Sequence, residues 1–385
     1  MGEPRVLFVS HASQMAGAEL VLLDVVRSCR GASAFLFEDG PLSPALKERG
    51  LKVVKSRWGR GISKVKRDAS LWSAAAPLAL RLGAVIAEIA VAALRHDLVY
   101  ANSQKAFALA AIAAAIVRRP VIWHLHDIVD RSHFGSAQRR LQIALANRLA
   151  SRVIVPSQAA ATAFTLAGGR PDLLEIVPNG IDLVREGRPP AKLRSELGLP
   201  AGPLAGVFSR LAPWKGQHVV LRALAQLPDL QCVIVGDALF GEQDYALELR
   251  ELASKLQLGD RVRFLGHRSD VPRLMQAVDV IIHPSVSPEP FGRTLVEAMR
   301  AGVPVIATDT GAASDILDRG RAGTLVEPND PRSLARAIAD VLAKPSARAQ
   351  QLVYAAARAR SMYGVAAMSH AISGVIGRVA PGARA

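Results

Sequence analysis

The stretch that decides the fold is Ser287-Pro-Glu-Pro-Phe-Gly-Arg-Thr-Leu-Val-Glu-Ala-Met-Arg-Ala-Gly302. Pro288 and Pro290 flank Glu289 and keep it out of a helix, because proline lacks the N–H that a helix needs and restricts the residue before it. A helix is predicted to begin at 292–294 and to run to the closing glycine, since glycine often follows the last residue of a helix. Glu289 is therefore predicted to lie in a loop just before a helix.

The first turn of that helix has backbone N–H groups without partners inside the helix. Together with the positive end of the helix dipole, they form a binding site for phosphate. Gly292 allows the phosphate to approach the backbone closely. Glu297 lies about one turn in, eight residues after Glu289, where it can accept hydrogen bonds from sugar hydroxyls. The amides at the start of the helix belong to Phe291, Gly292, Arg293 and Thr294.

A second loop lies upstream, in the stretch Gly206-Val-Phe-Ser-Arg-Leu-Ala-Pro-Trp-Lys-Gly216. A strand is predicted to end at about Phe208, and the loop after it carries Arg210 and Lys215. Two cations at the carboxyl end of a strand suit an anionic leaving group. We expect this loop and the Glu289 loop to meet at the same edge of the sheet.

Around these loops the chain alternates short apolar runs with longer helical stretches, which is typical of doubly wound parallel sheets. Helices are predicted over 17–29, 69–95, 103–117, 136–150, 157–166 and 347–380. Strands are predicted over 5–9, 32–37, 52–54, 97–100, 120–124, 152–155 and 174–177, and then over 204–208, 231–235, 261–264, 279–282, 304–307 and 323–326.

The polar, breaker-rich run at 186–190 predicts a linker. Two α/β domains are expected, over 1–185 and 186–364, with a final helix over 365–385 that packs back toward the first domain. Rossmann-like domains of this kind bind ligands at the carboxyl ends of their strands, so a site is expected in the cleft where the two domains face each other.

No signal peptide is evident, and two cysteines do not make a disulfide framework, which predicts a cytoplasmic protein. Residues 71–94 are apolar enough to be considered as a membrane span. Arg81 and Glu88 interrupt them, however, and favour an Ala-rich helix packed on a core.

Positive charge is unevenly distributed. The chain carries a net charge of +15, and residues 1–185 account for +10 of it, with 24 Lys and Arg against 14 Asp and Glu. Residues 52–67 hold seven cations and Trp58 but no acid. This patch is predicted either to bind an anionic membrane surface, as a peripheral protein does, or to be a solvated loop. No nucleic-acid-binding module accompanies the charge, so no nucleic-acid partner is expected.

Taken together, these segments resemble the retaining glycosyltransferase family 4. Glu289 and Glu297 match its pattern of two glutamates separated by seven residues, and Arg210 and Lys215 match its diphosphate-contacting pair. Further matches are Val-Pro-Asn-Gly-Ile-Asp at 177–182, Val-Gly-Asp at 235–237, Phe-Leu-Gly-His at 264–267, Ala-Gly-Val-Pro-Val-Ile-Ala at 301–307 and Gly-Thr-Leu-Val-Glu-Pro at 323–328.

The first half matches the family more loosely. Ala16-Gly-Ala-Glu19 resembles the family's glycine loop after the first strand, with Gly17 as the remaining phosphate donor. Trp123-His-Leu-His-Asp127 resembles its strand-end His-Asp, which implies that His126 lies near the reacting centre. Tyr100 and Asn102 stand where the family usually has histidines. His124 and His126 also suggest a metal site, but no third ligand is evident. No partner can be argued for His218 or His283.

The resemblance implies a GT-B fold, with an acceptor-binding domain followed by a nucleotide-sugar-binding domain. Its implied catalytic residues are His126, Arg210, Lys215 and Glu289. Its implied donor-binding residues are Gly17, Gly236, Phe291, Gly292, Arg293, Thr294, Leu295 and Glu297.

The predicted function is retaining transfer of a sugar, as a hexosyltransferase does, from a UDP- or GDP-sugar to a sugar or lipid-linked acceptor in cell-envelope polysaccharide, lipopolysaccharide or glycolipid synthesis. No metal or other cofactor is expected, because Lys and Arg stand in for the cation. The alternatives are a nucleotide-sugar epimerase or hydrolase on the same fold and a non-catalytic membrane-surface binding protein. A nicotinamide oxidoreductase is disfavoured, since no Gly-x-Gly-x-x-Gly follows a strand.

Overall fold

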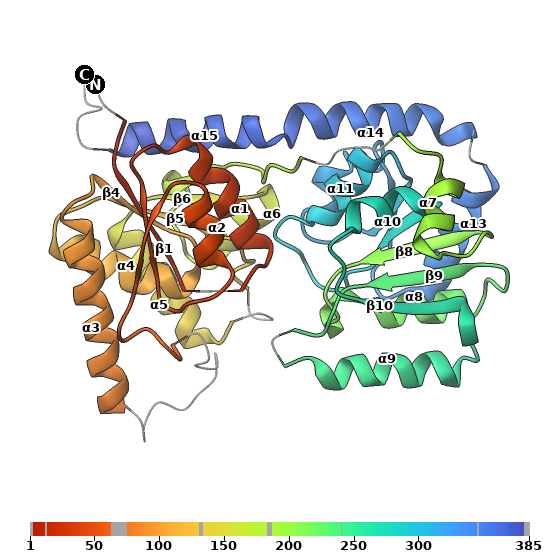
Figure 1. Cartoon of the computed structure of the whole chain (residues 1–385), viewed down its shortest axis with the longest axis horizontal. Coiled ribbons are helices and arrows are strands. Elements are labelled where there is room, and N and C mark those ends of the chain that lie inside the picture. The colour runs from red at the N-terminus through yellow and green to blue at the C-terminus, as the bar shows by residue number, and fades with distance from the viewer. Residues whose placement is uncertain are drawn as a thin grey trace. The chain divides into compact units, whose positions relative to one another are not determined.

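The computed structural model describes residues 3–11, 14–62, 75–130, 134–182, 187–239, 241–344 and 346–380. Two compact units make up the chain (Figure 1). Unit 1 contains residues 1–180 and 365–385, and unit 2 contains residues 181–364. The chain therefore returns to its first unit for its last helix.

Unit 1 is built on a parallel sheet in the order β3-β2-β1-β4-β5-β6-β7. Leu7 at the centre pairs with Ser33 on one side and Val99 on the other. The strand order reverses beside β1, which is the arrangement that opens a ligand crevice at the carboxyl edge of such sheets. The strands are β1 Val6–Ser10, β2 Ser33–Leu36, β3 Lys52–Lys55, β4 Leu98–Ala101, β5 Val121–His124, β6 Ala150–Val155 and β7 Leu174–Ile176.

Helices cover both faces of this sheet. One core contains residues of α1, α2 and α15, and the other contains residues of α3 to α6. Trp123 and Phe107 stack in the second core with ring centroids 4.4 Å apart. The helices are α1 Gly17–Val25, α2 Leu42–Glu48, α3 Ala75–Ala93, α4 Gln104–Ile116, α5 Ser136–Leu149, α6 Gln158–Leu166 and α15 Val365–Val379.

Unit 2 repeats the plan with a parallel sheet in the order β10-β9-β8-β11-β12-β13. Its strands are β8 Leu204–Phe208, β9 Gln231–Val235, β10 Val262–Gly266, β11 Val280–His283, β12 Val305–Thr308 and β13 Thr324–Val326. Its helices are α7 Pro190–Leu197, α8 Gln217–Leu224, α9 Gln243–Lys255, α10 Val271–Ala277, α11 Arg293–Ala301, α12 Ala313–Ile316, α13 Pro331–Ala343 and α14 Ala349–Met362.

The sequence predicts all thirteen of these strands, and their bounds agree to within two residues. Helix α2 was not among the helices that the sequence gave bounds for, and it contains a proline at position 44. The stretch 347–380 was read as helical, and the final helix predicted from residue 365 begins where α15 does. The helical run is interrupted at Tyr363 and Gly364, where unit 2 ends and the return to unit 1 begins.

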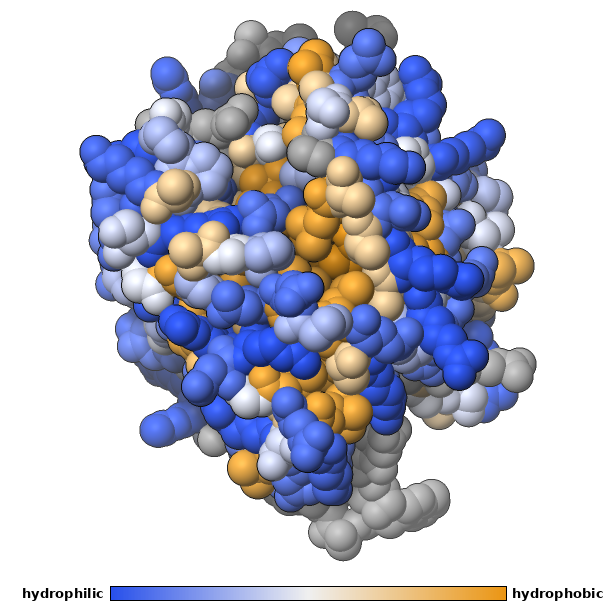
Figure 2. Space-filling model, turned by 90° about the vertical axis from the view of Figure 1, so that its right-hand side faces the viewer, coloured by the Kyte–Doolittle hydropathy of each residue, from blue (hydrophilic) through white to orange (hydrophobic). Residues whose placement is uncertain are grey.

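Some predictions fall on parts of the chain outside the described residues. They include the first residue of the predicted linker, residue 186, and the second half of the basic patch, with Lys64, Lys66 and Arg67. In the described ranges, none of the helices combines the length and the apolar character needed to cross a bilayer. Figure 2 shows a mostly hydrophilic face, with hydrophobic residues gathered in a band through its middle.

Candidate active site

The site in unit 2 forms where β8 and β11 lie side by side. These strands pair in parallel, with Ile281 opposite Gly206, so their carboxyl ends reach the same edge of the sheet. The loop after β8 carries Arg210 and Lys215, and the loop after β11 carries Glu289. The sheet order changes direction between these two strands, which is where parallel sheets leave a crevice for a ligand.

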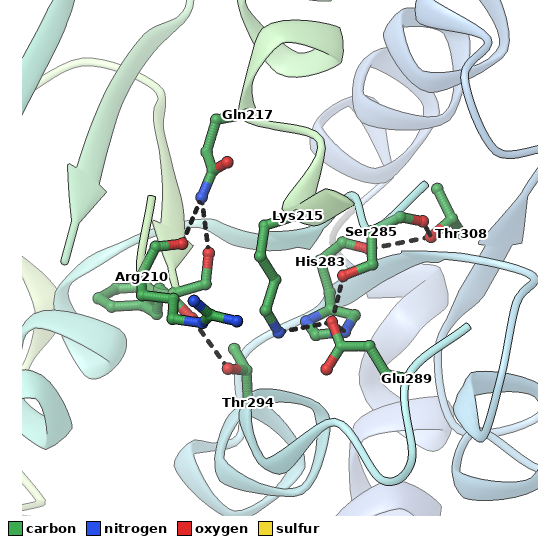
Figure 3. Close-up of polar contacts among 10 residues, drawn as sticks. Arg210, Lys215, Gln217, His283, Ser285, Glu289, Thr294 and Thr308 are labelled. Carbon is green, nitrogen blue, oxygen red and sulfur yellow. Dashed lines mark hydrogen bonds and ion pairs between the residues drawn. The ribbon is translucent and has the colours of Figure 1, made fainter. Parts of the chain in front are cut away.

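Glu289 is the centre of this edge (Figure 3). Its side chain is 8% exposed, and Lys215 Nζ donates to its Oε1 at 2.6 Å. His283 Nε2 lies 2.9 Å from the same oxygen, and the Ser285 hydroxyl also donates to it. Thr308 Oγ1 in turn donates to the Ser285 carbonyl oxygen at 2.5 Å. One carboxylate oxygen is therefore held by three donors, which come from the loop after β8, the end of β11 and the loop after β11.

This arrangement fixes the charge of Glu289. Burial alone raises the pKa of a carboxyl group, because the charged form loses its hydration. Here the electrostatic interactions and hydrogen bonds that Glu289 makes with His283 and Lys215 outweigh burial and hold the pKa of Glu289 well below its usual range. Glu289 is therefore ionised at neutral pH and is a hydrogen-bond acceptor.

The Glu289 loop also packs tightly on the loop after β12. Gly311 has a φ of +59°, and a Cβ there would come within 2.3 Å of the Glu289 backbone nitrogen. Ala312 N donates to the Glu289 carbonyl oxygen at 3.1 Å. A glycine is required at 311 both for its left-handed conformation and for this close approach.

The loop after β8 brings its two cations to one aromatic ring. The Arg210 guanidinium lies 5.3 Å and Lys215 Nζ 4.3 Å from the centroid of the Trp214 ring. Gln217 Nε2 donates to the Arg210 carbonyl oxygen at 2.9 Å and fixes the loop at the start of α8. Thr294 Oγ1 donates to the Phe208 carbonyl oxygen at 2.9 Å, which ties α11 to the end of β8 (Figure 3).

Helix α11 begins and ends at the predicted positions. Gly292 precedes it with a φ of +81°, and Gly302 follows it with a φ of +71°. Phe291 is buried, and its ring lies 5.8 Å from that of Tyr363, while Leu295 is fully buried in the core. Phe291 and Leu295 were predicted to bind the donor. Their side chains lie in the core, so only their backbone groups are left to contact a ligand at the helix terminus.

Glu297 and Arg293 form a pair on α11, with Arg293 Nη2 3.6 Å from Glu297 Oε1. Burial raises the pKa of Glu297, and Arg293 and His283 oppose that rise. Arg293 Nη1 is buried without a hydrogen-bond partner. Because a buried guanidinium N–H without a partner is costly, this group is available to an anion at the helix terminus.

Gly236 lies at the end of the neighbouring strand β9. A Cβ there would come within 2.1 Å of the Ser209 carbonyl oxygen, so the loop after β9 reaches the backbone that carries Arg210. The structure thus brings Gly236, Arg210, Lys215, Glu289 and the start of α11 to one edge. Gly17 and His126 belong to unit 1.

In unit 1, two histidines at the end of β5 have one partner each from the end of β4. Tyr100 OH lies 2.6 Å from His124 Nδ1, and Asn102 Oδ1 lies 3.0 Å from His126 Nε2. The two histidine rings are 3.9 Å apart between centroids. Tyr100 and Asn102 are the residues that depart from the family pattern, and the structure gives each a partner that motif matching missed.

The hydrogen bonds of Asn102 determine which nitrogen of His126 carries the proton. Asn102 Nδ2 donates to the Ala18 carbonyl oxygen at 3.2 Å, so Oδ1 faces the imidazole and can only accept. His126 Nε2 must therefore be the N–H, and Nδ1 keeps its lone pair. Burial lowers the pKa of His126 to about 3, so the ring is neutral at neutral pH.

The loop after β1 begins helix α1 at Gly17, close to this group. Ala16 N donates to Glu19 Oε2 at 3.2 Å, and Glu19 is buried. Burial raises the pKa of Glu19, and nearby Asp127 adds to that rise. Within the described parts of both units, no group of three or more His, Cys, Asp or Glu side chains is arranged to hold a metal ion.

Comparison with known proteins agrees with this geometry. The family Glycosyl transferases group 1 matches residues 192–359, and the family Glycosyltransferase Family 4 matches residues 16–185. The crystal structure of Anabaena Alr3699/HepE in complex with UDP is 39% identical, with a TM-score of 0.85 over 97% of this chain and 99% of that one. The chain belongs to glycosyltransferase family 4.

Other members show how far the match extends. The complex of Alr3699/HepE with UDP-glucose is 37% identical and has a TM-score of 0.86 over 97% of this chain and 99% of that chain. D-inositol 3-phosphate glycosyltransferase of Streptomyces scabiei is 35% identical over 207 residues, which are 50% of this chain and 46% of that protein. The chain matches about half the length of its curated relatives. The two sheets are the two Rossmann-like domains of the GT-B fold.

His283 and Ser285 are site residues that sequence reasoning missed. His283 is the last residue of β11 and precedes Glu289 by six residues, so the end of a strand before a Pro-Glu-Pro loop was the signal available. His218 on α8 has a partner on the next helix, because its Nδ1 lies 2.9 Å from the hydroxyl of Tyr245 on α9.

We predict that the free energy of unfolding depends less on pH in Glu289→Gln than in the wild type. A carboxyl group with a depressed pKa stabilises the fold above its unfolded value, near 4.5, and that contribution is lost as the pH falls through the folded value. The urea midpoint of unit 2 should therefore fall less between pH 7 and pH 3 in Glu289→Gln than in the wild type. Glu251→Gln is the control, since that side chain is 68% exposed. Parallel curves for Glu289→Gln and the wild type would contradict the assignment.

We also predict that His126 stays neutral well below the usual histidine pKa of 6.5. Imidazole nitrogen chemical shifts should report the Nε2–H form of His126 at pH 7 and no titration down to pH 5. In Asn102→Ala the preference for that tautomer should weaken, because the acceptor of Nε2–H is gone. A His126 signal that titrates near 6.5 in the wild type would refute the burial argument.

Proposed function

We propose that this chain transfers a sugar from a nucleotide diphosphate sugar to an acceptor hydroxyl, with retention of configuration and without a metal ion. The observation that carries the proposal is the edge formed by β8, β11 and the start of α11. It combines two loop cations, an ionised buried carboxylate and a guanidinium N–H without a partner. Such a set suits a diphosphate whose negative charge grows as the bond to the sugar breaks.

The donor diphosphate is placed at the N-terminus of α11, beside Arg210 and Arg293. Helix amides and the helix dipole favour an anion there. Lys215 then has two anionic partners within reach, Glu289 and the diphosphate. As charge develops on the leaving group, Lys215 can move part of its interaction from the carboxylate to the phosphate, so its stabilisation is greatest in the transition state.

Glu289 and Glu297 are assigned to the neutral parts of the donor. Glu289 is ionised and has a second carboxylate oxygen beyond the one that three donors hold, so it can accept hydrogen bonds from hydroxyls of the transferred sugar. Glu297 lies a turn into α11 and is assigned to the ribose hydroxyls. Hydrogen bonds to a charged acceptor of this kind contribute roughly 1.5–3 kcal/mol each.

The acceptor hydroxyl attacks C1 from the face that the diphosphate leaves. The bond from C1 to the acceptor oxygen forms, the bond from C1 to the phosphate oxygen breaks, and the hydroxyl proton passes to the departing diphosphate. His126, with a pKa of about 3, is too weak a base to take that proton. A phosphate oxygen, whose second pKa is about 6, is the better acceptor. His126 Nδ1 is assigned to orient a hydroxyl.

The relatives guide the choice of substrates. Solved structures of Anabaena Alr3699/HepE contain UDP, glucose and UDP-glucose. Lipopolysaccharide core biosynthesis mannosyltransferase LpsB of Rhizobium meliloti is 32% identical over 174 residues, 43% of this chain and 49% of that protein. We therefore propose a uridine nucleotide sugar as the donor and a cell-envelope saccharide or lipid-linked saccharide as the acceptor, used on the cytoplasmic side of the membrane.

We predict that UDP and UDP-glucose raise the melting temperature of the wild type by several degrees. At a ligand concentration about 100 times Kd, binding to the native state adds about 2.7 kcal/mol. Each variant is compared with its own ligand-free form, and the shift should be lost in Lys215→Ala and Glu297→Ala. Lys255→Ala, on the surface of α9, is the matched control and should keep the full shift. Equal shifts in all three variants would remove Lys215 and Glu297 from the donor site.

We further predict retention in the product. With an α-linked donor, the one-bond C1–H1 coupling of the product should report an α-linkage, and turnover should persist in EDTA. A β-linked product would refute retention, and loss of turnover in EDTA would refute metal independence. Nucleotide release that is independent of any acceptor would instead favour a hydrolase.

A further inference from the structure

Helix α3 is apolar on its outer side as well as on its inner side. Val85 and Ile89 are buried in the core of unit 1. On the opposite side Leu80 is 76% and Val91 66% exposed, and Leu94, the residue after the helix, is 56% exposed. Gly83 and Ala87 lie between them at helical spacing and are exposed as well. Contiguous exposed apolar surface on a helix marks a site for interaction with a protein, a ligand or a membrane.

The apolar surface continues over the two helices that follow. Helices α3, α4 and α5 contribute to the same core, and their outer sides point away from the sheet (Figure 1). Ile116 at the end of α4 is 65% exposed, Ile112 is 36% exposed, and Leu141 on α5 is 57% exposed. We define the α3–α5 face by these exposed side chains, namely Leu80, Val91, Leu94, Ile112, Ile116 and Leu141.

Among the described residues of α3, α4 and α5, acidic side chains are scarce. The three helices contain a single acidic residue, Glu88, which accepts hydrogen bonds from Arg57 N at 3.1 Å and from the Ser56 hydroxyl. The exposed charged side chains on α5 and at the ends of α3 and α4 are all cationic, namely Arg95, Arg118, Arg140 and Arg148. The surface is therefore apolar and basic, with no exposed carboxylate on these helices to balance it.

Trp58 extends the face on one side. Arg81 on α3 donates to the Trp58 carbonyl oxygen at 3.4 Å and holds the loop after β3 against the helix. The Trp58 side chain is 53% exposed. Tryptophan is favoured at the boundary between lipid and water, where its ring is partly apolar and its N–H stays hydrated.

We propose that the α3–α5 face binds the surface of an anionic lipid bilayer, with α3 lying in the plane of the headgroups. Apolar side chains then enter the boundary of the acyl region, and the flanking arginines contact lipid phosphates. A second copy of the chain fits this face poorly. A two-fold interface would bring the same arginines together with no carboxylate between them. The sequence placed membrane binding in the loop at 52–67, and this inference moves its centre to the helices.

The face lies next to the candidate acceptor residues of unit 1. Asn102, which contacts His126, is followed by Ser103, whose hydroxyl caps α4 by accepting from Ala106 N at 3.2 Å. The carboxyl edge of the sheet thus leads directly into a helix of the α3–α5 face. If the proposed function holds, an acceptor with a lipid tail in the bilayer would have its saccharide delivered to this edge.

The test is sedimentation of the full chain with vesicles of phosphatidylcholine alone and of phosphatidylcholine with phosphatidylglycerol. The wild type should pellet with the anionic vesicles only. The triple variant Leu80→Gln, Val91→Gln, Leu94→Gln should bind them at least about tenfold more weakly, because three side chains lose their insertion into the acyl boundary. A second triple variant, Arg118→Gln, Arg140→Gln, Arg148→Gln, should bind more weakly and lose most of the salt dependence.

Leu247→Gln is the matched control. Leu247 is 60% exposed on α9 of unit 2, beside Asp244, Glu248 and Glu251, and its substitution should leave vesicle binding unchanged. The melting temperature with and without UDP shows that each variant is folded and separates this test from the donor proposal. Undiminished binding by the first triple variant, or a wild type that ignores anionic vesicles, would overturn the inference. So would a dimer of the wild type that this variant converts to a monomer.

Discussion

The structure of unit 2 depends on one buried carboxylate. Glu289 is ionised in a place where an isolated charge would be very costly, and breaking such a pair by removing one partner costs roughly 3–5 kcal/mol. Its compensation comes from Lys215 on the loop after β8 and from His283 at the end of β11. These two strands are neighbours in the sheet, so the ion pair can form only if the sheet has this order. The same contacts that stabilise the loops therefore assemble the site.

The sequence predicted the fold well because short apolar strands alternate with helices through both units. Short apolar strands between helices predicted all thirteen strands, since a strand buried on both faces has a continuous apolar run. Helix α2 was not among the helices given bounds, and its Pro44 lies in the first helical turn, where proline is tolerated. The start of α15 was predicted as that of a final helix from residue 365, although the composition of 347–380 is uniform. The ring of Tyr363, at the break, lies 5.8 Å from that of Phe291, a contact between residues distant in sequence.

The candidate site was predictable where motif and backbone coincide, as at Arg210, Lys215 and Glu289. It was not predictable where a residue acts through a distant contact. Ser285 was not anticipated, although its hydroxyl donates to Glu289. Asn102 shows the limit most clearly, because its departure from the family pattern gave no indication of its contacts. Only the contacts with His126 and the Ala18 carbonyl show that an amide with both ends occupied can hold a neutral imidazole.

The two units use positive charge in opposite ways. In unit 2 the cationic side chains of the site lie against an aromatic ring or a carboxylate, as Lys215 does, so their field is confined to a small volume in which a diphosphate would bind. On helices α3 to α5 the exposed cations have no carboxylate beside them on those helices, so their field extends into solvent and is limited only by salt. A field of the first kind distinguishes transition state from ground state. A field that extends into solvent attracts the protein to an anionic surface. An enzyme with the lipid-linked acceptor proposed above would use both kinds of field, and in that proposal each unit supplies one of them.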